Sequence, residues 1–378
     1  MQPFITGHEE LIHDVEYDFY GTHIATCSSD QHIKVFDYDA TTSQWILNDL
    51  WKAHNSLVVR LSWANPEFSS APILASCSYD RTVKIWQEQP DELHGSGRRW
   101  IKLATLAIES YGPIYDVVFA PSHLGLKLAC VGSDSIFRIY DSIDSSDLTQ
   151  WALTTEIPLS NLQLPVKSLQ SSFSIEWCPS KYTKTLKFIV VVIDQAFIYS
   201  TLPNSDNDEL DSTANPGRQS GLQSSSNQDH HHHHQESTGD DEAASKPPDS
   251  DTKYLRIASL PEHNGLIRSV SWAPSMGRLF HLIATGCKDG FVRIFKVKEL
   301  PNGELEIETV AALSDHKLEV WRVKWNNTGT ILSSAGDDGN VRLWKSNYLN
   351  EWKCMSVINT SNRTDNRIAD NEQKNVPA

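Results

Sequence analysis

Short apolar runs recur along the chain, and polar turns separate them. Within the runs, apolar residues either alternate with polar ones or follow one another for a few positions, which is typical of half-buried and fully buried β-strands. Five runs close on an aromatic residue that lies six positions after an Asp. The pairs are Asp30/Phe36, Asp80/Trp86, Asp134/Tyr140, Asp289/Phe295 and Asp338/Trp344. A spacing that recurs in this way indicates a repeat architecture.

Each repeat predicts four strands, with a tight turn at the Asp between the second and the third. A weaker unit, the fourth of six along the chain, reads FSIEWCPS, FIVVVID and AFIYS, and its Asp194 lies five residues before Tyr199. Four units also carry a His 22 or 26 residues before the Asp, namely His8, His54, His263 and His316. This combination is the WD-repeat signature. It predicts an all-β fold, a β-propeller of six blades.

The propeller is expected to span residues 1–358, with one interruption. Ser200–Thr252 is almost free of large apolar side chains and falls between the third and fourth strands of unit four. Its composition cannot bury a core, so we expect a disordered acidic, His-containing insertion at 200–252. The segment 359–378 is expected to be a disordered tail for the same reason.

The two ends of the chain suggest a ring without a latch. The last blade supplies its own fourth strand from Trp352–Ile358, and the opening MQPFITG is a poor strand. Nothing then remains to join blade six to blade one. We expect an open ring with strand edges at the seam, and exposed edges invite pairing with another chain.

Charge and composition narrow the possible functions. The net charge is −15, and 39% of residues are hydrophobic, but much of the acidic excess lies in the insertion. The rest has no basic patch, which disfavours direct binding to nucleic acid. No apolar run approaches the roughly 20 residues that cross a bilayer, so no membrane insertion is expected. The N-terminus lacks the apolar core of a signal peptide, so we expect a protein of the cytosol or nucleus.

Sets of His, Ser or Thr, and Asp resemble catalytic triads. They occur, each with its closing aromatic residue, as His8, Thr26, Asp30 and Phe36; His54, Ser76, Asp80 and Trp86; His263, Thr285, Asp289 and Phe295; and His316, Ser334, Asp338 and Trp344. An enzyme needs one such set in one cleft, whereas these recur four times in register. We therefore predict hydrogen-bonded structural networks and no enzyme activity.

Other candidate chemistry is sparse. Cys27, Cys77, Cys130 and Cys287 precede repeat Asp residues and are expected in the core rather than in metal or disulfide sites. The run His230–His234 has the side chains of a metal site, but low-complexity drift is the favoured interpretation. No phosphate-binding glycine loop occurs, so no cofactor is expected.

Several stretches are more specific than the general repeat. HEELIHDVEYDFYG, SGRRWIKL, FAPSHLGLKLACVGSD and IRSVSWAPSMGR resemble a small WD-repeat nucleoporin family of fungi. This family is the sister of the WD-repeat subunit shared by the vesicle coat and the nuclear pore. The resemblance covers all six units and omits only the insertion and the tail.

The resemblance implies a scaffold subunit of the Y-shaped outer-ring complex of the nuclear pore. An α-helical-solenoid nucleoporin would donate a seventh blade in trans at the seam. The resemblance also implies membership of a vacuole-associated complex that regulates TOR signalling. By strand position alone, we expect the seam at Val15 and Tyr17 in blade one and at Val323 and Trp325 in blade six.

Two other functions compete with the scaffold. A WD-repeat adaptor would bind peptide or substrate partners on a ring face, without a donated blade. A propeller hydrolase would need a unique nucleophile, with Ser76 and Ser334 as the candidates.

Overall fold

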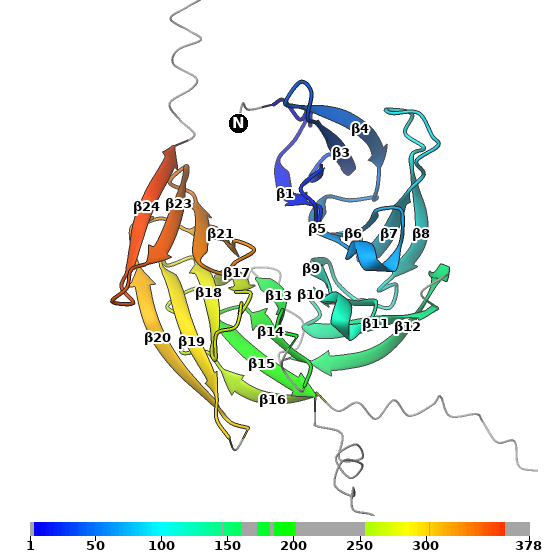
Figure 1. The fold of residues 1–378 in the computed structure, drawn as a ribbon. Helices are drawn as coiled ribbons and strands as arrows, with labels where there is room; N and C mark the ends of the chain where they lie inside the picture. The colour runs from blue at the N-terminus through cyan, green and yellow to red at the C-terminus, as the bar shows by residue number, and fades with distance from the viewer. Residues whose placement is uncertain are drawn as a thin grey trace, which may run out of the picture.

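The strands gather into sheets that surround a common axis (Figure 1). The computed structural model describes residues 4–144, 147–159, 172–181, 185–201, 254–301 and 303–359. Within these residues there are six four-stranded antiparallel sheets. The fold class is therefore the expected six-bladed WD-repeat propeller. The predicted disordered tail lies outside the described residues, apart from Asn359. So does the predicted insertion, apart from its first two residues.

The first three blades follow the chain from the axis outward. Blade one contains β1 (Ile12–Tyr17), β2 (His23–Ser28), β3 (His32–Asp39) and β4 (Gln44–Lys52). Blade two contains β5 (Val58–Trp63), β6 (Ile73–Ser78), β7 (Val83–Glu88) and β8 (Trp100–Leu106). Blade three contains β9 (Ile114–Phe119), β10 (Lys127–Gly132), β11 (Ile136–Asp144) and β12 (Asp147–Pro158). The 3₁₀ turns η1 (Pro66–Phe68) and η2 (Ser122–Leu124) follow the innermost strands of blades two and three.

The last three blades repeat this order. Blade four contains β13 (Phe173–Trp177), β14 (Lys187–Val192), β15 (Gln195–Thr201) and β16 (Tyr254–Ser259). Blade five contains β17 (Ile267–Trp272), β18 (His281–Cys287), β19 (Val292–Glu299) and β20 (Leu305–Leu313). Blade six contains β21 (Val320–Trp325), β22 (Ile331–Gly336), β23 (Asn340–Ser346) and β24 (Trp352–Asn359). β15 and β16 are hydrogen-bonded neighbours, although residues 202–253 separate them in sequence.

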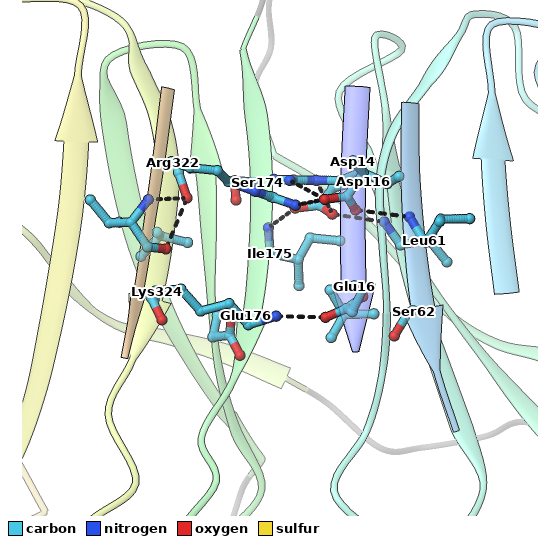
Figure 2. Close-up of a pocket in the computed structure, with 17 residues that line it drawn as sticks. Asp14, Glu16, Leu61, Ser62, Asp116, Ser174, Ile175, Glu176, Arg322 and Lys324 are labelled. Atoms are coloured by element: carbon cyan, nitrogen blue, oxygen red, sulfur yellow. Dashed lines mark hydrogen bonds and ion pairs between the residues drawn. The ribbon is translucent and has the colours of Figure 1, made fainter. Parts of the chain in front are cut away.

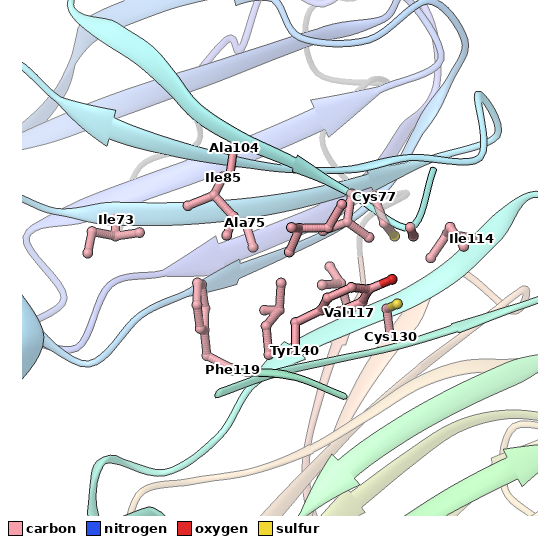
Figure 3. Close-up of a cluster of buried hydrophobic side chains, with 14 of the residues drawn as sticks. Ile73, Ala75, Cys77, Ile85, Ala104, Ile114, Val117, Phe119, Cys130 and Tyr140 are labelled. Carbon is pink, nitrogen blue, oxygen red and sulfur yellow. The ribbon is translucent and has the colours of Figure 1, made fainter. Parts of the chain in front are cut away.

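Neighbouring blades bury apolar side chains between their facing sheets. Between blades two and three, for example, Ile85 and Cys77 pack with Val117, Phe119 and Tyr140 (Figure 3). Similar clusters join blades one and two, three and four, four and five, and five and six. Among the described residues, no such cluster joins blade six to blade one. The hydrophobic core therefore consists of five interfaces, and the ring is open where a sixth would close it.

The N-terminal residues pack on their own blade instead of on blade six. The Phe4 ring lies 5.0 Å from that of Phe36 on β3, and Lys34 Nζ donates to the carbonyl oxygens of Thr6 at 3.2 Å and Gly7 at 2.6 Å. Phe4–Gly7 forms no strand, and each terminal blade contains only its own four strands within the described residues. The chain itself does not latch the ring in this part of the structure (Figure 1).

The opening differs from the expected strand edges. In each blade the edges of the sheet lie at the axis and at the perimeter, because the strand order runs from the innermost to the outermost strand. The surfaces that face along the ring are sheet faces, which carry side chains. A partner at the opening would therefore pack against two faces, and the prediction of exposed edges at the seam is wrong.

Candidate functional site at the ring opening

The triad-like sets are hydrogen-bonded networks within single blades. In blade two, His54 Nδ1 lies 2.9 Å from the Asp80 carboxylate, and His54 Nε2 lies 2.8 Å from Ser76 Oγ. Trp86 Nε1 donates to the same Ser76 oxygen at 2.9 Å. Because a carboxylate only accepts, Nδ1 carries the proton, and the Ser76 hydroxyl donates to Nε2. Blade six repeats this arrangement with His316, Ser334, Asp338 and Trp344.

These networks serve the fold rather than catalysis. Ser76 and His54 are buried, and Ser76 Oγ already makes hydrogen bonds to two side chains. In blade one, His8 bridges Asp30 at 2.8 Å and Thr26 at 2.9 Å, while Phe36 has no donor to add. Each network ties the turn before the innermost strand to the turn between the second and third strands. Nothing in these contacts leaves a hydroxyl free to attack a substrate.

Blade five departs from the expected network. Both carboxylate oxygens of Asp289 accept from the Arg293 guanidinium, at 3.2 and 2.6 Å. A bidentate, charge-assisted pair is stronger than a neutral hydrogen bond, so Arg293 replaces His263 at Asp289. His263 keeps its 2.8 Å contact with Thr285, whereas its buried Nδ1 side-chain atom has no hydrogen-bond partner assigned among the described residues. Burial, with the positive charge of Arg293, lowers the pKa of His263 to about 4.

Blade three has a substitute for the missing His that sequence reasoning overlooked. Ser110 Oγ donates to the Asp134 carboxylate at 3.1 Å, from a position 24 residues earlier in the chain. Arg138 also pairs with Asp134, at 2.9 Å. The sequence did contain a signal for the Arg138 pair, namely an Arg four residues after the repeat Asp. The same spacing recurs in the pairs made by Arg293 and Arg342.

The opening exposes one residue that is buried at every equivalent position. Val15 on β1 lies opposite Thr26 on β2. Thr26 is four residues before Asp30, the Asp of this repeat. The residues at this position in blades two to six are Leu61, Val117, Ile175, Val270 and Val323, and all are at most 3% exposed. Val15 is 51% exposed. Its neighbour Tyr17 is 47% exposed. Both sit on a face that no blade of this chain covers.

The other side of the opening is the far face of blade six. Val341 and Leu343 on β23 are only partly buried, whereas Ile33 and Val35 at the same positions of blade one are fully buried against blade two. Ile358 on β24 is 53% exposed. Apolar residues thus face the opening from both terminal blades.

The sequence-based placement of the seam in blade six is wrong. Val323 and Trp325 lie on β21, but they are buried in the core between blades five and six. Trp325 Nε1 also donates to the Ser271 carbonyl of blade five at 3.2 Å. The innermost strand of every blade turns these positions toward the preceding blade. They therefore mark the opening only in blade one, because blade one has no predecessor.

Ion pairs bridge the opening close to the axis. Arg322 on β21 pairs with Asp14 on β1, and Lys324 Nζ lies 2.6 Å from the Glu16 carboxylate (Figure 2). The Glu16 carboxylate raises the pKa of Lys324. Asp14 also accepts from the Leu61 backbone N–H at 3.1 Å. Blades one and six are therefore held together by charges at the axis, while their apolar faces remain uncovered.

Comparison with known proteins agrees with this architecture. A family model described as WD domain, G-beta repeat matches residues 2–37, 47–87, 255–296 and 307–345. The chain is 45% identical over 397 residues to Nucleoporin SEH1 of Saccharomyces cerevisiae, and the alignment covers 95% of this chain and 99% of the yeast protein. The chain belongs to the SEH1 family of nucleoporins. The repeat matches fall on the four units that carry a His.

SEH1 relatives from distant organisms show similar coverage. Nucleoporin seh1 of Schizosaccharomyces pombe is 35% identical over 382 residues, covering 95% of this chain and 96% of that protein. Nucleoporin SEH1 of Homo sapiens is 36% identical over 364 residues, covering 93% and 86%. SEH1 nucleoporins and WD-repeat propellers are structural families, which confirms the prediction that the chain is not an enzyme. No helix among the described residues is long and apolar enough to cross a membrane.

Proposed function

We propose that this chain is a non-catalytic scaffold subunit in the outer ring of the nuclear pore complex. Its place is the nuclear envelope, where it contacts other outer-ring nucleoporins and supports the transport of protein and mRNA. The names of its SEH1 relatives support this role, since they are nucleoporins from yeasts to vertebrates. Its binding surfaces are for proteins, and it neither enters a membrane nor binds nucleic acid directly.

The ring opening is the proposed site of the main contact. An α-helical-solenoid nucleoporin donates a small β-sheet in trans, which packs between blades one and six as a seventh blade. The exposure of Val15 is the observation that carries this proposal, because five equivalent residues are buried by a neighbouring blade. Burying a side chain such as Val or Ile stabilises a complex by about 1.5–3 kcal/mol. Both sides of the opening offer such residues, so a donated sheet gains from each face.

The experiment is affinity purification of tagged full-length chain from its own cells, with subunit ratios measured by mass spectrometry. The wild type is expected to recover one α-solenoid nucleoporin at a one-to-one ratio, with other outer-ring subunits. Val15→Asp and Ile358→Asp should lose that partner, because each places a charge in an apolar interface. Leu255→Asp is the matched control, since Leu255 is 46% exposed on the outer strand of blade four.

Unchanged recovery by both seam variants would overturn the donated blade. Circular dichroism of each purified variant checks that the propeller remains folded. Loss of the partner after Leu255→Asp, with the seam variants intact, would move the contact to the perimeter.

A second role follows from the family resemblance, namely membership of a vacuole-associated complex that regulates TOR signalling, at the cytoplasmic face of the vacuole membrane. The single opening supports a specific form of this proposal. One opening holds one donated sheet, so a given molecule serves one complex at a time. Purification through a vacuolar subunit should then recover this chain without the outer-ring solenoid partner. Co-recovery of both on one molecule, shown by sequential purification, would contradict it.

The competing adaptor function predicts a different result. An adaptor binds its partners on a ring face, so alanine substitutions there would abolish recovery while Val15→Asp would have no effect. Varied partners, each well below one per chain, would favour that function over the scaffold.

A further inference from the structure

A groove lies on the face of the ring at which the innermost strands of blades one to four, β1, β5, β9 and β13, end. One cavity of about 250 Å³ lies at the mouth of the central channel, with walls formed mainly by aromatic and proline side chains. These are Tyr17, Phe19, Trp63, Phe119, Pro121, Trp177 and Pro179. A second cavity of about 360 Å³ shares Phe19 and Trp63 with the first and continues over blade two. The Phe19 side chain is 65% exposed between the two.

The floor of the first cavity is acidic. Glu16 and Glu176 line both this cavity and the channel along the axis. Figure 2 shows the channel side chains in two layers, with Glu16, Glu176 and Lys324 below Asp14, Asp116 and Arg322. Lys324 pairs with Glu16, and its charge also acts on the Glu176 carboxyl from farther away.

The channel lining holds four carboxyl groups but only three cationic side chains. Asp14 pairs with Arg322, Glu16 with Lys324, and Asp116 with Arg60 at 3.1 Å. Glu176 is the carboxylate left without a cation of its own among the residues that line the channel. Burial raises the pKa of Glu176 to about 8, so this carboxyl holds its proton at neutral pH while no further cation lies beside it. An additional positive charge at this place would stabilise the ionised carboxylate.

We propose that this groove binds an extended peptide segment of a partner protein, which inserts one arginine or lysine side chain beside Glu176 and Glu16. The aromatic wall suits such a side chain, because cations are attracted to the faces of aromatic rings. The second cavity then receives an apolar side chain of the same segment, against Trp63 and Pro72. Aromatic anchors of this kind carry much of the binding energy in protein interfaces.

Other occupants fit less well. Phosphate groups are repelled by the carboxylates. A metal ion needs more ligands than two carboxylates, and no group of three His, Cys, Asp or Glu residues suited to a metal occurs among the described residues. The groove shares Tyr17 with the uncovered face of blade one, but its lining does not include Val15 or any residue of blade six, and its other walls reach blades two to four.

The test is a phage selection of random 12-residue peptides on the immobilised full-length chain, followed by fluorescence anisotropy with the selected peptides. Enriched sequences are expected to share one Arg or Lys next to apolar residues. Their binding should weaken about tenfold or more on Glu176→Gln, and to a similar degree on Phe19→Ala. Val15→Asp should bind them normally, which separates this site from the ring opening.

Matched controls are available on other blades. Glu308→Gln makes the same charge change on the exposed strand β20, and Tyr348→Ala removes an aromatic ring that is 92% exposed in blade six. Neither should affect binding. The proposal is overturned if no peptide is enriched, if the enriched peptides lack a basic residue, or if they bind Glu176→Gln as tightly as the wild type.

Discussion

Asp14 and Arg322 form an ion pair across the ring opening, although 308 positions of sequence separate them. Asp14 is buried on the innermost strand of the first blade, while Arg322 is partly exposed on that of the last. Together with Glu16 and Lys324, they fix the terminal blades at the axis. The opening is therefore anchored at its narrow inner end and uncovered farther out, as a site for an added sheet requires.

Removing the Arg322 side of this pair should loosen the terminal blades. We expect Arg322→Ala to lower the free energy of unfolding by about 1 kcal/mol or less, because Arg322 is partly exposed and Asp14 keeps its backbone donor. Arg322→Glu should cost more, since it places a second carboxylate beside Asp14. Urea denaturation measures both, and amide hydrogen exchange in β1 should accelerate. Lys353→Ala on β24, which breaks an exposed pair with Glu351, is the control and should change neither quantity.

The hydroxyl networks should differ in strength between blades. Ser76→Ala leaves both Trp86 Nε1 and His54 Nε2 without their partner, so we expect a loss of about 2–3 kcal/mol. Thr285→Val keeps the shape of the side chain and removes a hydroxyl that contacts only His263, so about 1 kcal/mol should be lost. Urea denaturation midpoints compare the two variants. Equal losses would show that the tryptophan link adds nothing.

The same substitution should cost different amounts of stability on the two terminal blades. Val323→Ala opens a cavity in the core between blades five and six, and we expect a loss of about 2 kcal/mol. Val15→Ala in the isolated chain should cost less than about 0.5 kcal/mol, because the side chain is half exposed. Thermal or urea denaturation of the purified chain measures this difference. In complex with a blade-donating partner, the cost of Val15→Ala should appear as weaker binding instead.

Glu176 should make stability depend on pH. The pKa of Glu176 rises from 4.5 to about 8 on folding. Between these two pH values the folded chain binds a proton that the unfolded chain has lost. The free energy of unfolding therefore falls as the pH rises from 4.5 to about 8. Glu16, Lys324, Asp116 and Arg60 are the charged groups around it. Glu176→Gln removes this contribution. The variant should match the wild type near pH 4 and become progressively more stable than it up to about pH 8.

Thermal denaturation of both proteins across this range measures the effect. Glu308→Gln, which changes an exposed carboxylate on β20, is the control. A flat difference for Glu176→Gln would mean that the Glu176 carboxylate is not desolvated in the folded chain.

Much of the fold was predictable because the residues that define each blade lie close together in the sequence. The Asp that turns the chain, the aromatic residue six positions later and the alternating strands lie within one unit, so Asp80 and Trp86 could be placed without knowing any other blade. The His–Ser–Asp sets were also recognisable as structural, since they recur in register. The approximate blade boundaries followed from the same spacing.

Details that depend on competition between side chains were less predictable. The pattern in blade five resembles that in blade two, yet Arg293 binds both oxygens of Asp289, and His263 contacts Thr285 without the hydrogen bond to the Asp that His54 makes in blade two. Ser110 takes the role of a missing His through a position that no consensus residue marked. Such outcomes depend on which donor has the better hydrogen-bond geometry to a carboxylate in the folded chain. Sequence spacing does not specify that geometry.

The sequence by itself determined the six-unit repeat and its strands, including the fourth strand that the last blade supplies from its own residues. Only the tertiary structure decided where the uncovered surface lies. Val15 and Val323 occupy the same repeat position, but blade five buries Val323 while no described blade covers Val15. The balance of charges in the channel was likewise decided in space, since Glu176 and its neighbours come from different blades. Burial and electrostatics depend on distances between units, whereas a repeat pattern specifies only what lies within one.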